Sequence, residues 1–138
     1  MKSLSTLGLT TMLACIMLFV VCKSESHLDN LYKGKTEKEL EALSAEKFSK
    51  IVAFASPKNC SDTSEWEMMD IQTVCGTSYI PYHRSVDKTS LQNMVHDYNK
   101  LMKIYQPMIA PRINCMPYQK PLEVICKEGK ASILYQNP

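Results

Sequence analysis

The hydrophobic pattern of residues 36–56 is that of an amphipathic helix. Apolar side chains recur at spacings of three and four, as on a helix with one buried face, at Leu40, Leu43, Phe48, Ile51, Val52 and Ala55. Thr36 and Glu39 fit a capping box, in which a hydroxyl and a carboxylate satisfy the free amide groups of the first turn. Ser56 and Pro57 end the pattern. We therefore predict a helix between Thr36 and Ser56.

A second helix is predicted over residues 62–74. Asp62 is a good N-cap, Glu65 follows three residues later, and Gly76 suits a C-terminal stop. The apolar face of this helix is formed by Trp66, Met69, Ile71 and Val74. The next segment, residues 77–86, is aromatic and interrupted by proline, so we predict a packed loop there.

The third predicted helix, residues 89–106, is the most periodic part of the chain. Thr89 and Gln92 offer a second capping box, and Pro107 marks the end of the helix. One apolar stripe runs along it, formed by Leu91, Met94, Val95, Tyr98, Leu101, Met102 and Tyr105. A stripe of this kind usually faces a core.

The pattern changes after Pro107, because further prolines break any helix there. Residues 122–126 and 131–135 are β-prone and flank Lys127-Glu128-Gly129-Lys130, in which the glycine suits the positive φ of a tight turn. The predicted fold class is therefore mainly α. We expect a small, disulfide-stapled domain of three main helices with a C-terminal β-hairpin or extended tail.

The N-terminal pattern predicts export. Lys2 precedes an apolar run from Leu7 to Val21, and Val20 and Cys22 fit the small-residue positions before a cleavage site. A membrane-spanning helix needs about 20 apolar residues, more than this run supplies. We therefore predict a signal peptide at residues 1–22 and a single secreted, extracellular domain at residues 23–138 without a membrane anchor.

Four of the six cysteines remain once the predicted leader is removed: Cys60, Cys75, Cys115 and Cys126. An even number in an exported chain indicates two disulfides. The spacings contain no Cys-x-x-Cys pair and no neighbouring pair of histidines, so we expect no metal site.

The predicted helix at residues 62–74 restricts the pairing. It would separate Cys60 from Cys75 by roughly 20 Å, whereas disulfide-linked Cα atoms lie about 4.4 to 6.8 Å apart. Two long-range pairings remain. We slightly favour Cys60–Cys126 with Cys75–Cys115 over Cys60–Cys115 with Cys75–Cys126.

Asn59-Cys60-Ser61 satisfies the rule for N-linked glycosylation, so Asn59 is the candidate modification site. Motifs for enzymatic chemistry are not found: the chain has no Gly-x-Ser-x-Gly elbow, no glycine-rich phosphate loop and no His-Glu-x-x-His. We therefore name no catalytic residue and expect no cofactor, and an enzyme is the less favoured interpretation.

Charge and exposed aromatics suggest how the protein acts. Removing Lys2 from 16 Lys and Arg leaves 15, against 14 Asp and Glu, a balance that disfavours nucleic-acid binding. Rigid aromatic side chains make good interface anchors, so Tyr79, Tyr82 and Tyr118 form the candidate binding surface. We predict a secreted binding or signalling protein that recognises an extracellular partner protein. The alternatives are a carrier of a small apolar ligand or, less favoured, a protease inhibitor or an enzyme.

Overall fold

The computed structural model describes residues 31–136, so the predicted signal peptide and the start of the predicted mature chain lie outside the described residues. The elements below belong to one compact unit that begins at Gly34. They are helices α2 (Glu37–Ala55) and α3 (Lys88–Ile109), the short 3₁₀ turns η1 (Thr63–Glu65) and η2 (Ala110–Arg112), and strands β1 (Trp66–Thr73), β2 (Gly76–His83), β3 (Pro121–Lys127) and β4 (Lys130–Tyr135). The prediction of a mainly α domain with three main helices is wrong, because the described chain combines two helices with two antiparallel hairpins.

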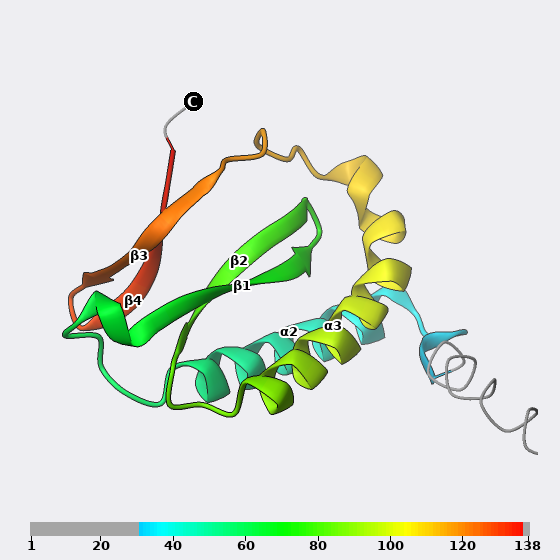
Figure 1. The fold of residues 1–138 in the computed structure, drawn as a ribbon. Coiled ribbons are helices and arrows are strands. Elements are labelled where there is room, and N and C mark those ends of the chain that lie inside the picture. Colours follow the sequence, from blue (N-terminus) through cyan, green and yellow to red (C-terminus); the bar gives the residue numbers. More distant parts are fainter. Residues whose placement is uncertain (1–30, 137–138) are drawn as a thin grey trace, which may run out of the picture. The chain divides into compact units, whose positions relative to one another are not determined.

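The two hairpins and the helix pair form successive layers (Figure 1). Strands β1 and β2 make hairpin A, and strands β3 and β4 make hairpin B. Helices α2 and α3 pack against each other and contact β2 and β1, respectively, while hairpin B contacts both strands of hairpin A. Hairpin A is therefore the central layer, packed between the helices and hairpin B.

Helix α2 forms where the pattern predicts it. The Glu39 amide donates to Thr36 Oγ1 at 3.3 Å, and the Thr36 amide donates to Glu39 Oε2 at 2.8 Å. Both halves of the capping box are therefore present. In the part of the chain that the structure describes, neither α-helix combines the length and apolar composition that crossing a bilayer requires.

Helix α3 differs from its prediction at both ends. Its N-cap is Asp87, whose carboxylate accepts from the Ser90 amide at 2.6 Å, and not Thr89. The helix also continues through Pro107 to Ile109. Burial of Ile109 extends the apolar stripe by one more turn, and this packing outweighs the backbone hydrogen bond that proline cannot make.

The predicted helix at residues 62–74 is instead strand β1. Asp62 does act as a cap, with its carboxylate accepting from the Ser64 amide at 2.8 Å, but it caps only the turn η1. Trp66 and Ile71 are an odd number of residues apart and therefore point to opposite faces of the strand, and both are buried. A strand buried on both faces lacks the polar and apolar alternation that identifies strands in sequence.

The predicted packed loop at residues 77–86 is also wrong, because most of it belongs to strand β2. The two strands pair from Trp66 opposite His83 to Thr73 opposite Gly76. Gly76 has a positive φ of 101°, so its backbone freedom serves the turn of hairpin A and does not end a helix.

Hairpin B forms as predicted from its turn residues. Glu128 and Gly129 have φ values of 52° and 76° between the paired residues Lys127 and Lys130. Two successive positive φ angles match the right-handed twist of a tight antiparallel hairpin.

The two predicted disulfides are present, as Cys60–Cys126 and Cys75–Cys115. This is the favoured member of the two pairings, but the helix that supported it does not exist. Exclusion of a Cys60–Cys75 bond holds for another reason, because a strand rises about 3.3 Å per residue against about 1.5 Å for a helix. Strand β1 therefore separates these cysteines even more widely than a helix would.

Candidate functional site

An open groove of about 680 Å³ lies at the end of hairpin A that carries the Gly76 turn. The two hairpins are close together near Trp66 and separate toward this turn (Figure 1). An exposed segment without helix or strand, residues 113–120, leads from the helical end of the chain to β3, and we call it the strap. The groove is lined by Thr73, Cys75, Thr77, Ser78, Tyr79, Met116, Pro117, Tyr118, Gln119 and Tyr135.

The strap is held at both of its ends. The Cys75–Cys115 disulfide joins its first half to the turn of hairpin A. The Gln136 amide donates to the Lys120 carbonyl at 2.9 Å and fixes the other end beside β4. The turn itself is tied to α3, because the Gln106 side-chain amide donates to the Val74 carbonyl at 3.3 Å. These connections hold the groove walls in place.

Two of the predicted surface tyrosines meet in this groove. The hydroxyl oxygens of Tyr79 and Tyr118 lie 3.4 Å apart, although the residues are 39 positions apart in the chain. Tyr118 is 66% exposed, and Tyr79 is half-buried. The pKa of Tyr79 is raised above its ordinary value, first by the hydrogen bond with Tyr118 and then by desolvation. Tyr135 adds a third tyrosine to the groove.

Tyr82 lies elsewhere, on the opposite face of β2. It is three residues from Tyr79, so the alternation of a strand directs the two side chains to different faces. Tyr82 is only 2% exposed, its hydroxyl donates to Glu67, and the Lys88 ammonium lies 5.7 Å from the centre of its ring. The pKa of Tyr82 is raised above its ordinary value, first by burial and then by the hydrogen bond to Glu67. The structure thus brings Tyr79 and Tyr118 together and separates Tyr82 from them.

The lining of the groove is uncharged. Its side chains supply tyrosine rings, hydroxyl groups, one carboxamide and one thioether, and none of them carries a formal charge at neutral pH. A few polar groups among aromatic rings are typical of a site that fixes the orientation of a bound ligand. Among residues 31–136, no cluster of three His, Cys, Asp or Glu side chains is placed to hold a metal ion.

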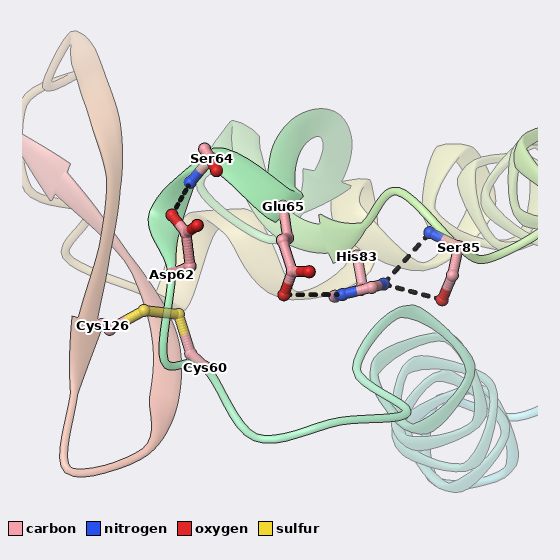
Figure 2. A network of polar contacts seen from close by, with 7 residues as sticks. All are labelled: Cys60, Asp62, Ser64, Glu65, His83, Ser85 and Cys126. Atoms are coloured by element: carbon pink, nitrogen blue, oxygen red, sulfur yellow. Dashed lines mark hydrogen bonds and ion pairs between the residues drawn. A yellow bond between two sulfur atoms is a disulfide. The ribbon is translucent and has the colours of Figure 1, made fainter.

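A second polar network lies at the other end of hairpin A (Figure 2). His83 is 4% exposed, with Nδ1 at 2.7 Å from Ser85 Oγ and Nε2 at 3.4 Å from Glu65 Oε2. Nδ1 also accepts from the Ser85 amide at 3.1 Å, so Nε2 is the ring nitrogen that faces the Glu65 carboxylate.

The residue types Ser, His and Glu occur together in hydrolase triads. Here, however, Nδ1 is shared between the hydroxyl and the backbone amide of the same Ser85. That geometry closes a local turn after β2, and we assign the network to ordering this turn. The sequence offers no signal for this network, because Glu65 reaches His83 only once the strands pair.

Asn59 and Ser61 are both exposed, so the glycosylation motif is accessible in the folded chain. Between them, Cys60 is buried, and its amide donates to the Gly129 carbonyl at 2.8 Å. The motif thus lies directly beside the attachment of hairpin B. Glycosylation of Asn59 stays a prediction.

No family model matches the chain, no curated protein is detectably similar to it in sequence, and no solved structure is detectably similar to it in fold. The geometry of the groove therefore carries the functional argument.

Proposed function

We propose that this chain is a secreted, extracellular binding protein that recognises a partner protein at the tyrosine groove. One observation carries the proposal: Tyr79, Tyr118 and Tyr135 converge on an open, uncharged groove whose walls are joined by the Cys75–Cys115 disulfide. Tyrosine buries a large area at small entropic cost and offers a hydroxyl for hydrogen bonding. Because the walls of the groove are already in place, binding of a partner costs less free energy for ordering the side chains and loops of the groove.

Secretion is supported by two features of the chain. Lys2 followed by the apolar run from Leu7 to Val21 matches the pattern of a signal peptide. Two disulfides are typical of proteins that fold in an oxidising compartment. Expression in cultured animal cells tests this part of the proposal: the protein is expected in the medium, beginning near Lys23, and it should lose mass when treated with an N-glycosidase. Retention inside the cells would contradict it.

Recognition of a protein is favoured over transport of a small apolar ligand. A carrier encloses most of its ligand within an apolar cavity. This groove is open, and hydroxyl groups line much of it.

Capture of partners from extracellular fluid tests the binding function. The oxidised wild-type protein and the Tyr118→Ala variant are immobilised side by side, and bound proteins are identified by mass spectrometry. Met108→Ala serves as the matched control, because Met108 is exposed on α3 and does not line the groove. We expect a partner that wild type and Met108→Ala retain and Tyr118→Ala loses. A partner retained equally by all three proteins would place binding elsewhere.

A further inference from the structure

The groove runs along the outer edge of β2. Thr77, Ser78 and Tyr79 are consecutive residues of this strand, and all three line the groove. Consecutive strand residues point to opposite faces, so a space bordered by three in a row lies against the strand edge and not against one face. β2 pairs only with β1 in its sheet, which leaves this edge without a neighbouring strand.

Two hydrogen bonds identify which backbone groups of β2 point outward. The backbone amide of Gln72 donates to Asn99 Oδ1 at 2.9 Å, so the backbone amide and carbonyl groups of Gln72 point away from β2. Thr77 lies opposite Gln72 across the hairpin, so its backbone amide and carbonyl groups point away from β1. The Arg84 amide donates to the Glu65 carbonyl at 2.8 Å and so points inward. Because the direction alternates, Thr77 and Tyr79 both present their amide and carbonyl groups to the groove.

The same alternation explains why Pro81 is accepted in this strand. Pro81 occupies the next outward position after Tyr79, where a missing amide breaks no bond to β1. It also ends the row of free donors at one side. The free row therefore consists of Thr77 and Tyr79, whose backbone groups have no hydrogen-bond partner among the described residues.

We propose that an extended, uncharged peptide segment of the partner protein binds in the groove as a third strand beside β2. The segment pairs with the backbone groups of Thr77 and Tyr79, and the ring of Tyr118 contacts it from the strap. This inference rests on the proposed function and specifies the chemistry of the partner. Backbone pairing supplies affinity in this mode of recognition, and the side-chain pockets supply specificity.

Free backbone groups favour a peptide over the other occupants of such a groove. A neutral glycan would use the rings and hydroxyl groups but has no regular row of groups to pair with a strand edge. A second copy of the chain would have to insert a whole strand past the strap, which the Cys75–Cys115 bond holds beside hairpin A. A charged segment would be desolvated in the groove without an opposite charge in its lining.

A library of random linear peptides displayed on phage supplies the probe. Peptides are selected on the wild-type protein, with depletion on Tyr118→Ala. The best peptide is synthesised and then N-methylated at one position at a time, which removes a backbone donor and leaves every side chain in place. We expect binding to weaken at every second position of the paired stretch, because alternate amides of an added strand face β2.

Thr77→Pro and Thr77→Val form a matched pair of variants. Both remove the threonine hydroxyl, but only proline removes the outward amide. We expect Thr77→Pro to weaken peptide binding roughly fivefold to tenfold relative to Thr77→Val, the loss of one net hydrogen bond. Thermal melting of both variants detects misfolding, and the N-methyl scan on the wild-type protein stands independently of it.

Three outcomes would overturn the inference. They are the absence of any linear peptide that depends on Tyr118, an N-methyl scan without a period of two, and groove-dependent binding of a neutral glycan on an array or of a second copy in sedimentation experiments. In each case a partner captured through Tyr118 would leave the proposed binding function standing. Loss of that capture alone would count against the function itself.

Discussion

Hairpins A and B are both two-stranded and antiparallel, but they are held in the fold by different means. Hairpin A buries side chains on both faces, with Trp66 toward hairpin B and Ile71 toward the helices. Among the residues of hairpin B, Val124 alone is a buried core residue, and Leu122 and Leu134 are exposed. An isolated two-stranded hairpin is marginally stable at best in water. We infer that packing holds hairpin A, whereas the Cys60–Cys126 bond holds hairpin B.

The different support of the two hairpins determines how the walls of the groove are held. Hairpin A supplies the fixed wall, since α3 contacts β1 and α2 contacts β2. Tyr135 belongs to hairpin B, and Tyr118 belongs to the strap. These two side chains depend on the disulfides for their position. The groove therefore combines one packed wall with two walls attached by covalent bonds.

The largest expected effect is that of removing the Cys60–Cys126 bond. Cys60→Ala with Cys126→Ala opens a loop of 66 residues and is expected to lower the free energy of unfolding by about 4 kcal/mol. Urea unfolding measures the loss. Trp66, the single tryptophan, packs against Cys60 and Val124, so its fluorescence should shift to the red while the helical circular dichroism remains. An unchanged emission spectrum would show that packing alone holds hairpin B.

A matched isoleucine pair tests the packing half of the comparison. Ile71 on hairpin A is 1% exposed, whereas Ile133 on hairpin B is only half-buried. We expect Ile71→Ala to cost about 3 kcal/mol in urea unfolding and Ile133→Ala about 1 kcal/mol. Equal losses would mean that both hairpins depend on packing to the same degree.

We expect the glycines of the two turns to contribute about equally to stability. Gly76 in hairpin A and Gly129 in hairpin B both have positive φ, so each substitution to alanine is expected to cost about 1 to 2 kcal/mol. Substitution by asparagine, which tolerates this backbone conformation better, should recover part of each loss in the same unfolding experiment. A much larger loss at one turn would place the difference between the hairpins there.

The smallest expected effect is the loss of stability at acidic pH that Glu67 causes. The pKa of Glu67 on hairpin A is lowered from its ordinary value of 4.5, first by the hydrogen bond from Tyr82 and then by Lys88 and Arg84. A lowered pKa in the folded state stabilises the fold above 4.5, and this contribution is lost as the pH falls through the lowered value.

Melting temperatures at neutral and acidic pH test this sign. Glu67→Gln should lose less stability between the two conditions than wild type does. Glu123→Gln on hairpin B is the control, because the Glu123 side chain forms no hydrogen bond or ion pair with a described residue. An equal acid response in Glu67→Gln and wild type would exclude Glu67 as a contributor.

Local chemistry determined several elements from the sequence alone. The capping box at Thr36, the apolar stripe of α3 and the glycine turn of hairpin B each depend on neighbours within a few residues. The formation of two disulfides followed from an even number of cysteines in the part of the chain after the predicted leader. These features do not require knowledge of which segments meet.

Tertiary structure decided the remainder, and residues 66–83 show why. Their apolar side chains serve two packing partners, so the alternation that marks a strand is lost, and the caps at Asp62 and Gly76 fit a helix equally well. Only the pairing of β1 with β2 makes residues 76–83 a strand, in which Tyr79 and Tyr82 point to opposite faces. Only the path of the strap brings Tyr118 to Tyr79. A sequence pattern records that a side chain is apolar, but which surface buries it depends on segments far away along the chain.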